Sequence, residues 1–260
     1  MMQALRIAAT GMYAQQTNVD VLSNNIANLA TTGFKQQNVA FNDLVYQSRV
    51  GVGSITSSLG TIAPTGVQIG LGVGVGGIYP ILKQGALNRT DNDFDIALQG
   101  KGFFKISMPD GTTQFTRDGS FQIDNTGQMV TKQGHALDPA ITVPSDAVDL
   151  TISADGVVSA LVAGTNTNLG TITIATFANE SGLKNKGNNL YAETEASGTA
   201  QDTTPGLDGT GELLQGFLEA SNVDPIESVT RLITAQRAYE LNSRVISTAD
   251  EMLGTVTQIT

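Results

Sequence analysis

The chain of 260 residues contains no cysteine and no tryptophan, and its only histidine is His135. Without cysteine it can form no disulfide, no thiolate nucleophile and no cysteine-ligated zinc site. A single histidine excludes metal sites built from several imidazoles, and His135 lies in a turn-like segment where a structural surface histidine is expected. The sequence therefore singles out no catalytic, cofactor-binding or metal-binding residues, and we expect no cofactor.

Positive charge is also scarce, because 14 Lys and Arg residues stand against 24 Asp and Glu residues and give a formal net charge of −10. A nucleic-acid-binding protein needs a basic surface that meets the phosphates, so we expect no nucleic-acid partner. Charged residues of both signs make up only 15% of the chain, against a usual value of about 25%. A surface of neutral polar groups has little to repel its own copies, which favours self-association.

Long apolar runs are missing as well. No stretch approaches the roughly 18 apolar residues that a membrane-spanning helix needs. The N-terminal residues turn polar at Gln15, without the apolar central region of a secretory signal peptide. We therefore expect neither a membrane span nor a cleaved signal peptide.

Both ends of the chain have apolar residues at the spacing of a heptad repeat. The first repeat predicts a helix from about Gln3 to Thr31, ended by Gly33, because glycine most easily takes a left-handed conformation. Asp224 as N-cap and Pro225 at the first helical position predict a second helix that runs almost to the end of the chain. We call the row of repeat positions on each helix its seam. Both seams are narrow and rich in small residues, which suits contact between the two helices more than burial on the middle domain. They are formed by Leu5, Ala8, Met12, Gln15, Val19, Leu22, Ile26 and Leu29, and by Leu232, Ala235, Tyr239, Asn242, Ile246, Ala249, Leu253 and Val256.

The middle of the chain indicates short antiparallel strands. Alternating apolar residues are interrupted by glycine-containing turns about every eight residues, which is the rhythm of β-hairpins. The expected strands are Phe103–Ser107, Thr113–Thr116, Phe121–Ile123 and Met129–Thr131, followed by runs at 150–153, 157–158 and 171–177.

Residues 46–80 lie between the first helix and these strands, with nine glycines, a single basic residue and no acidic residue. Such a composition is typical of a flexible linker or of a segment that orders only against neighbours. The sequence thus predicts an α+β fold, with long N- and C-terminal helices forming a coiled coil and a central, mostly antiparallel β domain. The expected domains are 1–45 with 215–260 for the helices, 46–80 for an extended Gly-rich linking segment, and 81–214 for the β-rich domain.

Two short motifs match known ligand-binding patterns, but the residues around them do not fit those sites. Residues 72–77 match the G-x-G-x-x-G pattern, but no helix pattern begins after the third glycine, where a helix N-terminus should meet a pyrophosphate. Residues 91–102 begin with the acidic spacing of a calcium loop, but they lack its later Gly and Glu. We interpret both as structural turns.

Three separated pairs of motifs resemble the signatures of the bacterial flagellar rod and hook proteins. The resemblance covers essentially the whole chain, with the motifs in the family's order. The single middle β domain and the segment 46–80 favour the rod members over the hook members, and distal rod members over proximal ones, which stay the alternative. The motifs are LSNNIAN at 22–28 with TGFK at 32–35, DIALQGKGFF at 95–104 with TRDGSF at 116–121, and SNVDP at 221–225 with AQRAYELNS at 235–243.

The resemblance implies a structural subunit, and not an enzyme, that polymerises into a hollow helical drive shaft. Its terminal helices would form an inner coiled-coil layer, with the β domain outside. The assembly interface would comprise Asn25 and the seam residues named above, apart from Ala8. The implied partners are further copies of the chain, proximal rod and hook subunits, the basal-body ring proteins around the rod and the flagellar type III export apparatus. The implied location is the flagellar basal body, from the periplasm to the outer membrane, reached without a cleaved signal peptide.

The residues alone leave two other classes of protein open. A β-rich hydrolase would need a pair of carboxylates in a cleft, and the sequence singles out no such pair. A β-rich binding module would explain the middle domain but would give the two heptad seams no purpose.

Overall fold

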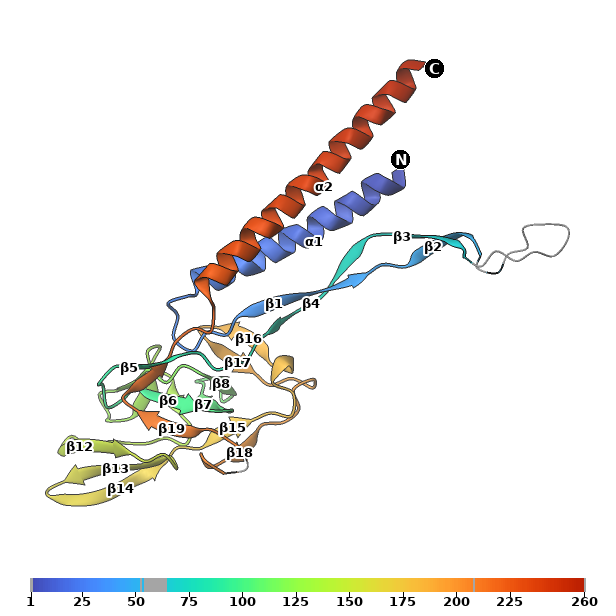
Figure 1. The fold of residues 1–260 in the computed structure, drawn as a ribbon. Coiled ribbons are helices and arrows are strands. Elements are labelled where there is room, and N and C mark those ends of the chain that lie inside the picture. Colours follow the sequence, from blue (N-terminus) through green and yellow to red (C-terminus); the bar gives the residue numbers. More distant parts are fainter. Residues whose placement is uncertain (1, 52, 54–64, 208, 260) are drawn as a thin grey trace. The chain divides into compact units, whose positions relative to one another are not determined.

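The computed structural model describes residues 2–51, 53, 65–207 and 209–259, with only the backbone for residues 256–259. It is an α+β protein with one long helix near each end of the chain and antiparallel strands between them (Figure 1). The α+β class, the terminal helices and the central antiparallel β domain are therefore confirmed, whereas the coiled coil stays a prediction. None of the described helices has a stretch long and apolar enough to cross a membrane.

The chain divides into two compact units, and it passes between them after residues 26, 36, 79 and 224. The helical unit holds both helices and residues 37–79, and the β unit holds residues 27–36 and 80–224. The segment expected as a separate linker thus groups almost entirely with the helices.

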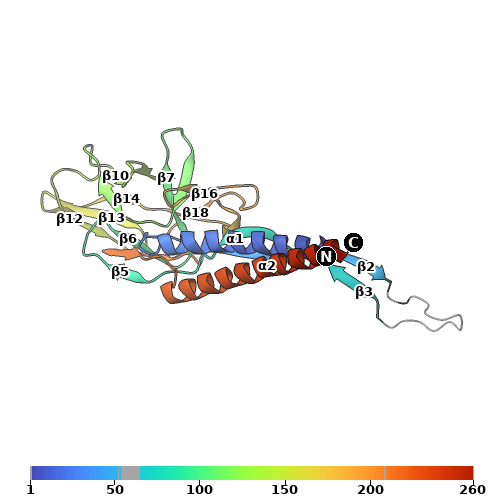
Figure 2. The same cartoon turned by 90° about the horizontal axis from the view of Figure 1, so that it is seen from above.

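The two helices are α1 (Met2–Ala27) and α2 (Pro225–Ile259), which run antiparallel within the helical unit (Figures 1 and 2). Helix α2 begins at Pro225, as the N-cap and proline signals predict. Helix α1 ends at Ala27, earlier than predicted, because the side chains of Asn28 and Thr31 bind each other and the Thr31 amide bonds to the Asn28 carbonyl oxygen. Such local bonds compete with the helical pattern. Gly33 does take the predicted left-handed conformation, with φ 69°.

Most described residues between 37 and 80 form a ribbon of paired strands. Strand β1 (Gln37–Asp43) pairs with β4 (Val73–Pro80), and β2 (Tyr46–Val50) pairs antiparallel with β3 (Val67–Gly70). Several large apolar side chains of the ribbon are exposed, among them Val45, Tyr46 and Ile78.

The β unit is built around a nine-stranded sheet with the order β16-β17-β8-β7-β11-β10-β9, in which β15 pairs with β7 and with β18. The predicted bounds of β7 to β10 are confirmed, because period-two alternation and glycine turns are local signals. The strands of this sheet are β7 (Phe103–Ser107), β8 (Thr113–Thr116), β9 (Phe121–Ile123), β10 (Met129–Thr131), β11 (Ala136–Leu137), β15 (Ile174–Thr176), β16 (Lys184–Gly187), β17 (Leu190–Ala192) and β18 (Gln201–Thr203).

Smaller sheets and one short helix complete the β unit. The three-stranded sheet has the order β12-β13-β14, and two-stranded sheets pair β6 with β19 and β5 with β20. These elements are β5 (Leu87–Arg89), β6 (Ile96–Gln99), β12 (Ala147–Ile152), β13 (Val157–Val162), β14 (Thr165–Thr171), the 3₁₀ helix η1 (Glu180–Gly182), β19 (Glu212–Gln215) and β20 (Phe217–Glu219).

Two apolar clusters lie in the β unit, and strand β7 contributes to both. Its neighbouring residues Phe103 and Phe104 point to opposite faces of the sheet, as successive strand residues must. Phe104 packs edge-to-face on Phe121 in the larger cluster, with ring centroids 5.4 Å apart. Phe103 packs on Phe177 and Tyr191 in the smaller cluster, at 5.9 and 5.6 Å. Burying each such aromatic side chain contributes about 1.5–3 kcal/mol to stability.

Candidate assembly helices and buried charge cluster

One face of α2 is covered within the chain. Most of the predicted seam lies on this face, but Tyr239 is 42% exposed and Ala238 is less exposed in its place. Val256 is outside the described side chains. The covered face is formed by Ser228, Leu232, Ala235, Ala238, Asn242, Ile246, Ala249 and Leu253.

Helix α1 is covered on more than its predicted seam. Ala14 and Val21 are buried although neither belongs to that seam. Leu29 lies beyond the end of α1, in the turns that follow it. Leu22 and Asn25 are buried, and the remaining predicted residues are half-buried, namely Leu5, Met12, Gln15, Val19 and Ile26.

The two helices approach each other closely at Gly11 and Asn242. A Cβ atom at Gly11 would come within 3.0 Å of both amide atoms of Asn242. The Asn242 Nδ2 is held by its own helix, since it donates to the carbonyl oxygen of Ala238 at 3.0 Å. A larger residue at position 11 would therefore press on this amide, and the two helices approach most easily with glycine there.

The ribbon contacts α1 through backbone groups. Thr10 Oγ1 accepts a hydrogen bond from the Val73 amide at 3.4 Å, and a Cβ at Gly72 would overlap the same hydroxyl at 2.1 Å. Farther along α1, Asn25 exchanges two hydrogen bonds with the backbone of Gln37, at 2.8 and 2.9 Å. These contacts explain why α1 is buried outside its heptad seam.

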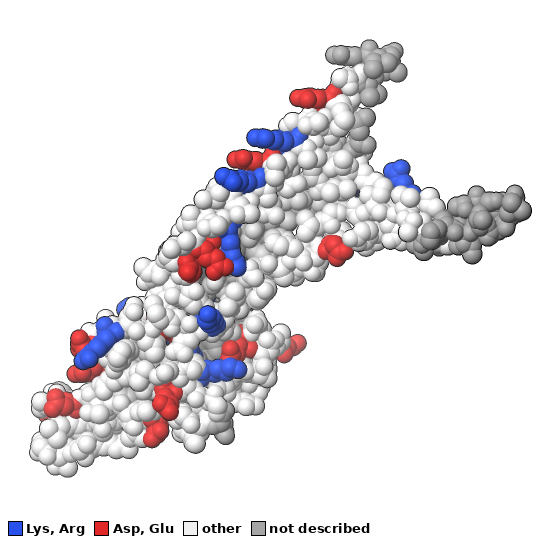
Figure 3. All heavy atoms as spheres, in the orientation of Figure 1, with Lys and Arg blue, Asp and Glu red and all other residues white. Residues whose placement is uncertain are grey.

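A second stripe of large apolar residues on α2 is exposed. We call Val229, Ile233, Leu241, Val245 and Met252 the uncovered stripe of α2, and their side chains are between 45% and 61% exposed. At 100° per residue these positions lie outside the covered face and spread over about 160° of the helix surface, with charged residues such as Arg237 and Arg244 between them. The surface visible in Figure 3 is mostly uncharged, and its Lys, Arg, Asp and Glu side chains lie singly or in small groups of mixed sign.

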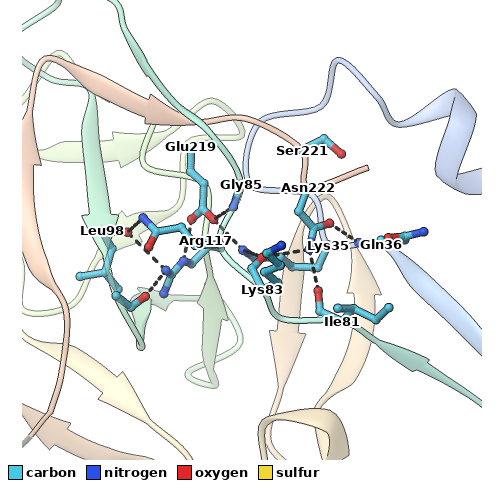
Figure 4. Close-up of polar contacts among 12 residues, drawn as sticks. Lys35, Gln36, Ile81, Lys83, Gly85, Leu98, Arg117, Glu219, Ser221 and Asn222 are labelled. Atoms are coloured by element: carbon cyan, nitrogen blue, oxygen red, sulfur yellow. Dashed lines mark hydrogen bonds and ion pairs between the residues drawn. The ribbon is translucent and has the colours of Figure 1, made fainter. Parts of the chain in front are cut away.

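Three charged side chains lie buried together in the β unit, around the Glu219 carboxylate (Figure 4). Its Oε1 accepts hydrogen bonds from Lys35 Nζ at 2.6 Å and from the Gly85 amide at 2.8 Å. Its Oε2 accepts a hydrogen bond from Arg117 Nε at 2.7 Å. We call Lys35, Arg117 and Glu219 the charge cluster.

Backbone carbonyl oxygens satisfy the excess positive charge of the cluster. The Arg117 guanidinium also donates to the carbonyl oxygens of Leu98, Gly100 and Gly102. Lys35 Nζ donates to the carbonyl oxygen of Lys83 at 3.1 Å. A buried charge is tolerated only when it is paired and hydrogen-bonded in this way.

The cluster shifts the pKa values of its members. Burial would raise the pKa of Glu219, but the positive charges of Arg117 and Lys35 and their hydrogen bonds outweigh burial and hold this pKa below its ordinary value of 4.5. Burial lowers the pKa of Lys35, although Glu219 acts in the opposite direction. The carboxylate is therefore ionised at neutral pH.

Next to the cluster, the Asn222 side chain binds three backbone groups. Its Oδ1 accepts from the Gln36 amide at 2.7 Å, and its Nδ2 donates to the carbonyl oxygens of Ile81 and Lys83 at 2.7 and 2.9 Å (Figure 4). Lys35, Arg117 and Asn222 lie within the family-like motifs at 32–35, 116–121 and 221–225, whereas Glu219 lies outside them. The sequence does contain a signal of a buried charge pair, because Glu219 and Lys35 each directly follow an apolar residue, where a charged side chain is unusual.

No metal site takes shape in the part of the chain that the structure describes, where no three His, Asp or Glu side chains gather in a way that could hold an ion. His135 is half-buried in the connection before β11.

Comparison with known proteins gives matches along nearly the whole chain. Three family profiles match: "Flagella basal body rod protein" at residues 5–35, "Flagellar hook protein FlgE/F/G D1 domain" at 97–160 and "Flagellar basal body rod FlgEFG protein C-terminal" at 214–259. A protein of Caulobacter vibrioides named "Flagellar basal-body rod protein FlgG" is 52% identical over 260 residues, covering 99% of each chain. Proteins of the same name are 47% identical in Agrobacterium fabrum (99% of each chain) and 46% identical in Buchnera aphidicola subsp. Acyrthosiphon pisum (100% of each chain).

Long terminal helices around an antiparallel β unit, together with these matches, define a structural protein of the bacterial flagellum and not an enzyme. The chain belongs to the family of flagellar basal-body rod proteins. Membership of this family places it in the flagellar basal body, among neighbouring rod and hook subunits.

Proposed function

We propose that the chain is the structural subunit of the distal rod, and that its copies polymerise through the terminal helices into a hollow helical shaft that transmits torque from motor to hook. The uncovered stripe of α2 is the observation that carries this proposal. Its apolar side chains are spread along about six helical turns and stay exposed in the single chain. A soluble monomer has little reason to keep such a stripe.

Burial of this stripe against a second copy supplies the energy of assembly. Each buried aliphatic side chain contributes about 1.5–3 kcal/mol, which is set against the cost of immobilising a subunit. Charges on α2 are balanced in sign, because basic and acidic residues are interspersed along it and Arg231 pairs with Glu227 at 2.6 Å. Since a lone helix is marginal in water, neighbours also stabilise the helices themselves.

In the assembled shaft, α1 and α2 would pair as a coiled coil around a central channel, with the β units outside. The predicted seam residues, including Leu5, Asn25 and Tyr239, would serve this packing. Proximal rod subunits and hook subunits would adjoin the two ends of the shaft, and ring proteins would surround it between periplasm and outer membrane. Delivery would use the flagellar type III export apparatus, without a cleaved signal peptide.

The experiment replaces the resident gene of a flagellated bacterium with variants of this chain and examines isolated basal bodies by electron microscopy. Leu241→Asp puts a charge in the uncovered stripe and should abolish rods while the purified monomer unfolds at the wild-type temperature. Val148→Asp is the matched control, because Val148 is an exposed aliphatic residue of the β unit. This control should give rods of normal length. Normal rods with Leu241→Asp would contradict the proposal.

A further inference from the structure

The chain leaves the β unit at four points, and we call the segments of the β unit next to these points its roots. There are four roots, one at each crossing. The first two are the beginning and the end of residues 27–36, the third begins at residue 80, and the fourth ends at residue 224. Force carried by the covalent chain between the helices and the β unit enters the β unit through these roots. The bonds between the roots therefore decide whether the roots deform one at a time or as a group when force is applied.

Asn222 joins three of the roots with one side chain. It accepts from the amide of Gln36, the last residue of its segment, and donates to the carbonyl oxygen of Ile81, the second residue of its segment. Asn222 itself lies two residues before the last crossing. A direct backbone bond from the Ile81 amide to the Gln36 carbonyl oxygen, at 2.7 Å, closes the same group.

Glu219 ties these roots to the sheet. Its backbone carbonyl oxygen accepts from the Gly33 amide at 2.8 Å, and its carboxylate binds Lys35 and Gly85. The other carboxylate oxygen binds Arg117, which follows strand β8. The roots are thus bound to each other by Asn222 and to the sheet by Glu219.

We propose that Asn222 is a positioning residue for load transfer, which makes the roots respond to force as a single joint. This inference rests on the proposed function of the chain as a rod subunit. Segments clamped together share a load, and their resistance to bending adds, whereas separate segments bend one at a time. Asn222 is half-buried and outside both apolar clusters, so its removal leaves no cavity in the core.

The chain offers a closely matched control in Gln215. Its Oε1 accepts from the Ile152 amide at 3.0 Å, and its Nε2 donates to the carbonyl oxygens of Leu150 and Asp93 at 2.7 and 3.0 Å. This is the same set of hydrogen bonds, also from a half-buried amide, but between segments that are not roots.

The test uses the absence of cysteine, since spin labels attach only where cysteine is introduced. Glu240→Cys on α2 and Asp146→Cys in the β unit are both at exposed positions, and pulsed electron paramagnetic resonance gives the distribution of distances between the labels. Asn222→Ala and Asn222→Asp should widen this distribution at least twofold. Asp cannot donate to the two carbonyl oxygens, so it should act like Ala. Gln215→Ala should leave the width unchanged.

Three results would overturn the inference: equal widths in the wild type and the Asn222 variants, equal widening by Gln215→Ala, or loss of folding in both Asn222 variants but not in Gln215→Ala. The distance measurement uses the monomer, so it is independent of whether the chain forms rods. In cells, Asn222→Ala should still build rods, but swimming speed should fall at least twice as steeply with medium viscosity as with Gln215→Ala. Equal slopes with normal rods would reject the load-transfer role while leaving the proposed function intact.

Discussion

Gly11 and Asn242 face each other between the two terminal helices, and a Cβ atom at residue 11 would lie only 3.0 Å from both amide atoms of Asn242. Ordinarily a glycine inside a helix costs about 1 kcal/mol relative to alanine. Here the glycine admits a polar side chain from the facing helix, and that side chain is held in place by its bond to Ala238.

Gly11→Ala should therefore not give the gain in stability that replacing glycine by alanine normally gives in a helix. Gly254→Ala is the control, because a Cβ at that position of α2 would meet no described atom within 4 Å beyond its own stretch of helix backbone. We expect Gly254→Ala to stabilise the helices by about 1 kcal/mol, and Gly11→Ala to destabilise them by a similar amount. Circular dichroism melts measure both. Combining Gly11→Ala with Asn242→Ala should restore the gain, and a double mutant as unstable as Gly11→Ala would disprove the contact.

Gly33→Ala should destabilise the β unit more than Gly216→Ala. Both glycines are left-handed, with φ 69° and 74°, so each substitution carries a backbone cost of about 1–2 kcal/mol. A Cβ at Gly33 would also come within 2.8 Å of the Asp118 backbone nitrogen, whereas one at Gly216 meets nothing within 4 Å. Urea unfolding of the two variants should differ by at least about 1 kcal/mol. Equal losses would show that the space at Gly33 is not restricted.

The charge cluster should make stability depend on acidity through Glu219. Its pKa is lowered in the folded state, so the stabilisation is present above the unfolded value of 4.5 and is lost as pH falls through the lower folded value. Glu219→Gln leaves two buried cations without their anion and should cost about 3–5 kcal/mol at pH 7. Urea unfolding between pH 7 and pH 3 should show the gap to the wild type closing in acid.

The matched control for this series is Glu195→Gln, because Glu195 is exposed. It should change stability by less than about 0.5 kcal/mol at pH 7. A gap between Glu219→Gln and the wild type that stayed constant down to pH 3 would mean that the charge of Glu219 contributes nothing.

Ionisation of Tyr191 should lower the stability of the folded chain at alkaline pH. Burial raises the pKa of Tyr191 to about 12, from an ordinary value of 10.0. The unfolded chain ionises first as pH rises, so stability should fall between pH 10 and pH 12, by roughly 2–3 kcal/mol at about 1.4 kcal/mol per pH unit. Tyrosinate absorbance during an alkaline titration should show one tyrosine that ionises late. Tyr191→Phe should remove this late step, whereas the control Tyr13→Phe, at an exposed tyrosine, should retain it. Loss of the late step with Tyr13→Phe instead would refute the assignment.

The elements that the sequence predicts correctly are those whose signals are local. Strands β7 to β10 alternate in hydrophobicity and end at glycine turns, and α2 begins at a proline after an N-cap aspartate. The end of α1 is missed because two side chains, Asn28 and Thr31, bind locally and stop the helix before the glycine signal.

The ribbon and the charge cluster could not be predicted, because their partners are distant in sequence. In the ribbon, Tyr46 pairs with Gly70 across a segment whose composition is typical of a linker. In the cluster, Lys35 and Glu219 are 184 residues apart. No periodicity or spacing relates positions that far apart.

The sequence by itself determined the α+β class, the two terminal helices and strands β7 to β10, because propensity, heptad spacing and turn residues act between near neighbours, and its motifs indicated the family. Only the tertiary structure decided which apolar residues of α2 are covered and which stay exposed, and why Gly11 must remain small. It alone brought Lys35, Arg117 and Glu219 together and set Asn222 across three chain segments. The physical reason is that burial and electrostatics depend on distance in space, which the chain fixes only when it folds.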